Sequence, residues 1–166
     1  MNFLSKVLDQ VVRFLFYLGV LSGAVMALLI FVSAVLRYVV GSPISFSDEL
    51  ASLLFVFLAF STFPYVLSRG EHIRLTIVTE RLAQPMQKIA QIFASIIFLG
   101  FASIFIYESY NFVQFSQLLN SHSEVSGILL WPWMALMPCS LGLCFLIELR
   151  AITRVLMLKA TKESAI

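Results

Sequence analysis

Few residues in this sequence of 166 amino acids have the type and spacing that catalysis or redox chemistry needs. Cys139 and Cys144 are five positions apart in one apolar stretch. On a helix this spacing turns the two side chains apart and separates them by about 8 Å along the axis, too far for a disulfide. We therefore interpret both cysteines as small apolar packing residues.

The two histidines, His72 and His122, fall in loops that we place on opposite sides of a membrane. Residues so separated cannot bind one haem iron or one metal ion together. The sequence therefore predicts no metal site, no cofactor and no enzymatic activity.

The composition places the chain in a membrane. Apolar residues make up 60% of the sequence and charged residues 12%, and the mean hydropathy is +0.96. Such values exclude a soluble globular domain. The net charge of +2 also leaves no basic surface for nucleic acid.

Four uncharged stretches are each long enough to cross a bilayer, which takes about 20 helical residues. They cover residues 14–36, 50–67, 89–107 and 125–147. We predict an all-α membrane protein with one four-helix transmembrane domain over residues 1–166. Pumps and proton-coupled exporters carry an ionisable group within a span. Because these stretches have none, we expect the chain by itself to transport nothing.

The positive charges predict the orientation of the chain. Ten of the eleven Lys and Arg residues precede the first stretch, follow the fourth or separate the second from the third, and only Arg37 lies on the other side. Because positively charged short loops stay in the cytoplasm, both termini are expected there. The outer side collects the carboxylates Asp48, Glu49, Glu108 and Glu124.

Short segments outside the spans look interfacial. Residues 1–15 place apolar side chains at helical spacing and Lys6 and Arg13 on the other face, which predicts an amphipathic helix anchored on the inner membrane surface. Residues 71–86 are a second such candidate, and Pro85 can open the next helix. Trp131 and Trp133 are expected to anchor the chain at the outer interface.

Two groups of residues are candidates for contacts between helices. Gly19, Gly23 and Ala27 follow one another at four-residue spacing, so that another helix can approach closely, either within the four-helix unit or from a partner. Arg37 lies near Asp48 and Glu49 at the outer boundary. An ion pair among them either closes the helix unit or reaches a partner subunit.

Three short segments resemble the small membrane subunit (DctQ-like) of tripartite ATP-independent periplasmic (TRAP) transporters. They read VLRY over residues 35–38, ISFSDEL over 44–50 and EHIRL over 71–75. In that family an Arg-Tyr ends the first helix, a Trp-x-acidic-Glu motif opens the second, and His-Ile-x-Val-Asp follows. This chain differs at Phe46, Asp48 and Thr76, where the family usually has Trp, Glu and Asp.

The resemblance implies partners and a function. The partners are a large membrane permease subunit, which carries the substrate and sodium sites, and a periplasmic solute-binding protein. The implied function is sodium-driven uptake of an organic acid (a dicarboxylate, a keto acid or an acidic sugar such as sialic acid) across the bacterial inner membrane. We expect this chain to scaffold and anchor the large subunit. His122 and Glu124, in the outer loop before the fourth stretch, either face the binding protein or are simply solvated. Two alternatives are an autonomous four-span channel or small exporter and a membrane enzyme or redox subunit.

Overall fold

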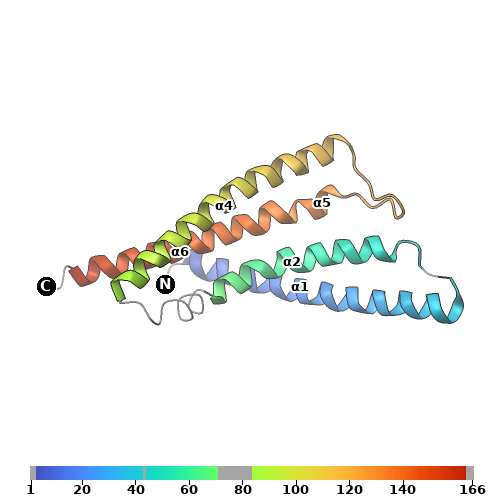
Figure 1. Ribbon diagram of the computed structural model, residues 1–166, viewed down its shortest axis with the longest axis horizontal. Coiled ribbons are helices and arrows are strands. Elements are labelled where there is room, and N and C mark those ends of the chain that lie inside the picture. The colour runs from blue at the N-terminus through green and yellow to red at the C-terminus, as the bar shows by residue number, and fades with distance from the viewer. Residues whose placement is uncertain (1–2, 43, 71–83, 164–166) are drawn as a thin grey trace.

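Four long helices make up most of the molecule (Figure 1). The computed structural model describes residues 3–42, 44–70 and 84–163. Helix α1 (Phe3–Val35) continues as a short π-helix, η1 (Leu36–Val40), and is followed by α2 (Ser47–Gly70), α4 (Gln84–Leu118), the short α5 (Trp131–Met134) and α6 (Leu136–Glu163). Among these described residues four helical segments are long and apolar enough to span a membrane, which confirms the predicted all-α class and number of spans.

The ends of two predicted spans differ from the helices. Helix α4 continues past Tyr107 to Leu118 and so contains Glu108, while α6 continues past Ile147 through Glu148. These two helices therefore continue past the ends of the uncharged stretches.

The fourth spanning segment begins at Trp131, because residues 125–130 form a loop in which Gly127 has a φ of 65°. A positive φ does not fit a right-handed helix and favours glycine. Helix α4, by contrast, opens as predicted, with Pro85 in its first turn.

The amphipathic N-terminal segment is not a separate helix in its described part. Helix α1 runs without interruption through this segment into the first span, since no Gly or Pro stands between residues 3 and 18. Two of its apolar residues face protein: Val12 is 2% exposed, and Leu8 packs beside it. The second interfacial candidate lies largely in residues 71–83, outside the described residues.

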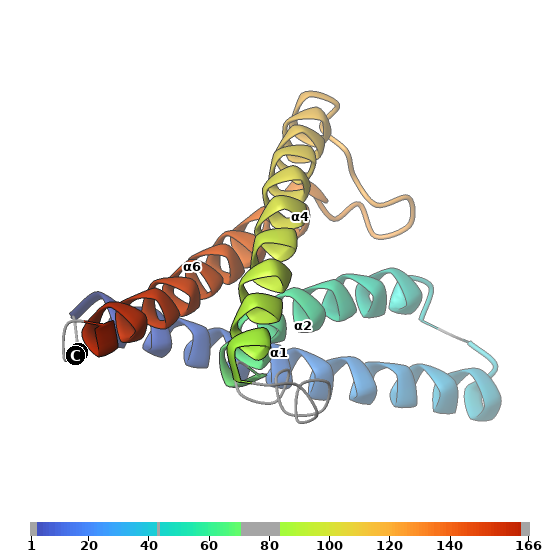
Figure 2. The ribbon, with the colours of Figure 1, turned by 60° about the vertical axis from the view of Figure 1, so that its left-hand side comes forward.

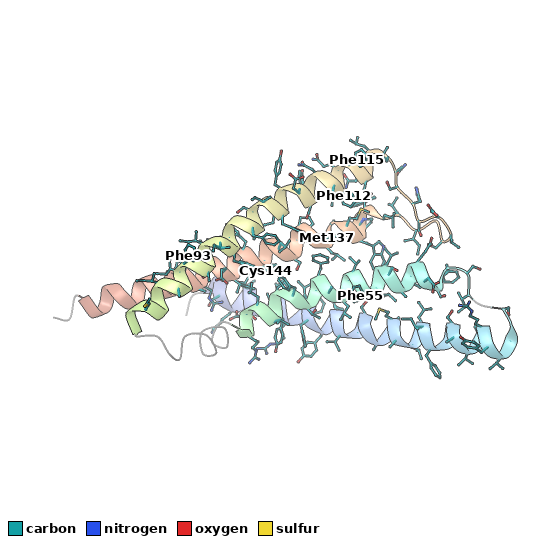
Figure 3. All side chains as sticks on the ribbon, viewed as in Figure 1. Phe55, Phe93, Phe112, Phe115, Met137 and Cys144 are labelled. Carbon is teal, nitrogen blue, oxygen red and sulfur yellow. The ribbon has the colours of Figure 1, made fainter. Side chains whose placement is uncertain are left out.

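The buried core lies where α1, α2 and α6 meet, at what we call the inner end. Val12, Leu67, Cys144 and Ile147 form it, and Cys144 is fully buried there (Figure 3). Two polar contacts flank this core. Arg150 Nη1 lies 3.0 Å from Asp9 Oδ1, and the Ser95 hydroxyl on α4 lies 2.5 Å from Glu148 Oε1 on α6.

From this core the helices form a row and not a closed bundle. Helix α2 packs between α1 and α6, and α6 between α2 and α4. Towards the opposite, outer end, α4 diverges from the others (Figures 1 and 2). The accessible surface is 11695 Å², compared with about 8,300 Å² for a compact soluble chain of this mass. Many apolar side chains therefore face lipid or another protein.

A hydrogen bond joins α6 to α2 at a carbonyl that a proline leaves without its helical donor. Pro64 lies inside α2 and has no N–H, so the carbonyl of Phe60, four residues earlier, loses its helical donor. The Ser140 hydroxyl of α6 donates to this carbonyl at 2.5 Å. Because a membrane interior offers no water to a free carbonyl, this bond both fixes α6 on α2 and completes the backbone of α2.

Candidate functional site at the outer end

The outer end is built around Glu49 in the first turn of α2. Its carboxylate accepts hydrogen bonds from the backbone N–H of Val125 at 2.9 Å, the backbone N–H of Ser126 at 2.8 Å and the Ser126 hydroxyl at 2.8 Å. These donors stand more than 70 positions away in the sequence. Glu49 therefore ties α2 to the connection between α4 and α5.

That connection folds into a small hairpin, residues 121–130, which we call the outer hairpin. The Ser123 N–H donates to Ile128 O at 2.9 Å and the Leu130 N–H to Ser121 O at 3.1 Å, while His122 pairs with Leu129 in a single antiparallel bridge. The left-handed conformation of Gly127 allows the tight return of the chain. A carboxylate bound to two adjacent backbone N–H groups fixes this hairpin over α2.

The tip of the outer hairpin lies against the first turn of α2, where Val125 and Ser126 bind Glu49, and several side chains of the hairpin stay exposed. His122, Glu124 and Val125 are exposed, and Val125 presents an apolar side chain that is 59% accessible. The hairpin therefore offers a mixed charged and apolar surface, fixed in position, at the outer end of the molecule.

Arg37 does not join this cluster. It lies exposed on η1 beside Tyr38, whose side chain is 86% accessible. In the part of the chain that the structure describes, the ion pair is that of Asp9 with Arg150, and neither Asp48 nor Glu49 pairs with Arg37. Glu49 instead uses its oxygens on the outer hairpin, and Arg37 is directed towards the surroundings of the chain.

The glycines of α1 lie against α2. A Cβ at Gly19 would stand 2.8 Å from Thr62 Cγ2 and 3.3 Å from the Leu58 carbonyl oxygen, and one at Gly23 would stand 3.3 Å from the Leu58 side chain. Ala27 is exposed. The neighbouring Ser22, which sequence reasoning missed, donates to Leu54 O at 2.9 Å across the same contact.

The predicted anchoring residues lie at both ends. Lys6 and Arg13 are exposed on the inner part of α1. Trp131 and Trp133 open α5 at the outer end, where both are half-buried, and Trp133 meets Phe57 of α2 edge to face with ring centroids 6.3 Å apart. Trp133 thus also holds α5 on α2.

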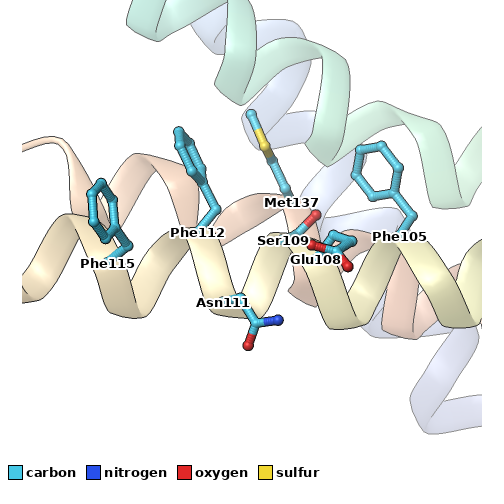
Figure 4. Close-up of a pocket in the computed structure, with 7 residues that line it drawn as sticks. All are labelled: Phe105, Glu108, Ser109, Asn111, Phe112, Phe115 and Met137. Atoms are coloured by element: carbon cyan, nitrogen blue, oxygen red, sulfur yellow. The ribbon is translucent and has the colours of Figure 1, made fainter.

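Sequence reasoning also missed a hollow between α4 and α6. Its walls include Phe105, Phe112 and Met137, and Glu108 stands at its edge (Figure 4). The signal in the sequence was the run of aromatic residues from 105 to 115, continuing at helical spacing past the predicted end of the span. Within residues 3–42, 44–70 and 84–163 no three His, Cys, Asp or Glu side chains lie together as a metal ion requires.

Comparison with known proteins agrees with this architecture. Residues 26–157 match the family described as Tripartite ATP-independent periplasmic transporters, DctQ component. Two curated proteins of Haemophilus influenzae, each carrying the name TRAP transporter small permease protein, are also similar. One is 30% identical over 105 residues, 63% of this chain and 64% of the relative, and the other is 33% identical over 103 residues, 62% and 60% respectively.

The family match covers four fifths of the chain, from the middle of α1 to α6, and so includes the Glu49 contact and the outer hairpin. The matches to the two relatives span less than two thirds of their lengths. Four spanning helices and the family together place the chain in the bacterial inner membrane as a multi-pass protein. The chain belongs to the DctQ component family, the small membrane subunits of TRAP transporters.

Proposed function

We propose that this chain is the small subunit of a sodium-driven TRAP transporter that takes up an organic acid such as a dicarboxylate, a keto acid or an acidic sugar. Its partners are a large permease subunit, which binds substrate and sodium, and a periplasmic solute-binding protein. The chain itself positions the large subunit in the bilayer.

The open row of helices carries this proposal. A row exposes two broad apolar faces, and its surface exceeds that of a compact chain by about 3,400 Å². Lipid covers part of such a surface, and a permanent partner subunit accounts for the rest. The ionisable groups of the last two spanning segments stand towards their ends, and the buried Glu148 is already bound by Ser95, so the proposed solute and ion sites lie in the partner.

Anchoring is the physical task in this proposal. If the large subunit carries substrate by moving one domain through the bilayer, another part must stay at constant depth. Basic residues at the inner end, Lys6 and Arg13 among them, and Trp131 at the outer end oppose movement along the membrane normal. Both termini then lie in the cytoplasm.

The proposed orientation is tested by labelling single cysteines in intact cells, in a variant without native cysteines. Cysteines at Ser42 and Gln117, both exposed, react with a membrane-impermeant maleimide, whereas one at Lys6 reacts only after permeabilisation. Labelling of a cysteine at position 6 in intact cells would show that the chain has the opposite orientation to the one proposed.

The outer hairpin is the proposed contact for the solute-binding protein, with the exposed His122 on its first arm and Glu124 at its tip. A binding protein that docks repeatedly needs a surface of fixed position, and the three hydrogen bonds to Glu49 supply that fixation.

Uptake by the assembled complex tests the scaffold role. Arg37→Ala and Glu49→Gln are expected to lower uptake, through weaker assembly or docking, without changing the order in which several organic acids are preferred. Ser42→Ala, at an exposed outer position, serves as the control. A changed order of preference in an intact complex would mean that this chain lines the substrate path.

A further inference from the structure

A shallow, open groove runs along α4 where the outer halves of α4 and α6 diverge, and Met137 is its lining residue from α6. Its volume is about 520 Å³, and its walls are Phe105, Phe112 and Phe115 of α4 and Met137 of α6 (Figures 3 and 4). The buried Ser109 also lines it, and Glu108 and Asn111 stand at the rim, both exposed. The groove thus combines an apolar wall with a carboxylate at one edge.

The two edges of the helix row differ in polarity. On α1 the exposed side chains between residues 14 and 36 are all apolar, with Tyr17, Leu28 and Phe31 each more than 60% accessible. The uncharged stretch of α4, residues 89–107, exposes Gly100 and Ser103 among apolar side chains such as Phe101 and Ile104, and the exposed Glu108 and Asn111 follow directly after it. Small and polar residues on a spanning helix are typical of contact with protein, whereas a wholly apolar face suits lipid.

Glu108 lies about one bilayer crossing along α4 from the basic residues that precede the third span. Twenty residues counted from Lys88, the last basic residue before the third span, reach Glu108, which is about the length of one bilayer crossing. Among the described residues Glu108 has no ion pair within the chain. A carboxylate at the membrane boundary is stabilised by a cation opposite it, and the outer end of this chain supplies only Arg37, on the far side of the row.

We propose that the α4–α6 groove is the docking site of the large permease subunit, which seats an apolar helix against Phe112 and Met137 and places a Lys or Arg opposite Glu108. The flexible Met137 and the aromatic rings provide an adaptable apolar wall for such a helix. This docking site rests on the proposed function, because it assumes that a large subunit is present.

Photo-crosslinking within the co-expressed complex tests the site. Benzoylphenylalanine replaces Phe112 in the groove or, as the matched control, Phe31, which is 66% exposed on α1. The expected result is a covalent adduct with the large subunit from position 112 and none from position 31. An adduct from position 31 alone, or a phospholipid adduct alone from position 112, would overturn the groove as the docking site.

A charge substitution tests the role of Glu108. Glu108→Gln is expected to reduce the amount of co-purified large subunit roughly threefold to tenfold, since it removes one partner of a charge pair. Gln117→Lys changes the net charge of the same helix equally, outside the groove, and is expected to leave the amount unchanged. Equal losses in both variants, or no loss in Glu108→Gln, would contradict the pairing.

If the wild-type chain co-purified with no large subunit, the proposed function itself would be wrong, and the proposed docking site would be wrong as well. The two failures are therefore distinguishable.

Discussion

Single polar side chains in this protein form hydrogen bonds with backbone groups that have no partner within their own helix or loop. Pro64 deprives the Phe60 carbonyl of its helical donor, and the Ser140 hydroxyl replaces that donor from another helix. Inside a membrane such a bond has no substitute from water. Ser140 is therefore expected to matter more for stability than most serines of the spanning helices.

Ser140→Ala is expected to lower the free energy of unfolding by about 1–3 kcal/mol, because the Phe60 carbonyl stays buried without a donor. Ser103→Ala is the control, since the Ser103 hydroxyl is exposed and donates to Leu99 O within its own helix. Denaturant titration of the purified chain in detergent micelles measures both. Equal stability of the two variants would show that the Ser140 bond contributes nothing.

Glu49 likewise binds backbone groups that have no other partner in the described part of the chain, the N–H groups of Val125 and Ser126 in the outer hairpin. Glu49→Gln keeps the size of the side chain but replaces one acceptor oxygen with an NH₂ group, which must face the N–H of either Val125 or Ser126 and so weakens the hold on the hairpin. We expect faster hydrogen exchange of these two amides, measured by mass spectrometry. Glu124→Gln, at the exposed tip of the outer hairpin, should leave their exchange unchanged. Unchanged protection in Glu49→Gln would show that the Glu49 carboxylate does not hold the outer hairpin on α2.

At the scale of elements, the close approach of α1 to α2 depends on glycine. Gly19→Leu places a side chain where even a Cβ would stand 2.8 Å from Thr62 Cγ2, and such overpacking costs roughly 1–3 kcal/mol. Gly100→Leu, where nothing lies within 4 Å, is the matched control and is expected to cost nothing. Thermal unfolding of the isolated chain compares them, and an unchanged midpoint in Gly19→Leu would mean that the two helices are free to separate.

The sequence predicts the elements better than their ends. Uncharged apolar stretches indicate four helices, because each must satisfy its own backbone in lipid. Helix ends are harder, since Glu108 and Asn111 look like loop residues although α4 carries them on an exposed face. The segment from Val125 to Leu130 looks like a span, but its backbone binds Glu49 from α2.

The same limit applies to the candidate site. Periodicity identifies Gly19 and Gly23 as contact residues but does not say which helix they meet. The clustering of Arg37 with Glu49 suggests an ion pair, whereas the donors to Glu49 come from a loop 76 and 77 positions away in the sequence. Contacts between segments so distant depend on how the helices pack, which the local sequence pattern does not record.

At the scale of the whole molecule, the chain is held together at its inner end and diverges at its outer end. The core of Val12, Leu67, Cys144 and Ile147 joins three helices, while α4 and α6 separate beyond it (Figure 1). This row of helices buries little of its own apolar surface, so a second subunit can pack against the apolar side chains that it leaves exposed.

Uptake into proteoliposomes tests the central claim, that this chain positions a transporting partner and does not transport. Liposomes would contain this chain alone, the large subunit alone or both, each with the solute-binding protein, an organic acid and a sodium gradient. The account predicts uptake only where both subunits are present. Solute flux through liposomes that contain this chain alone would contradict it.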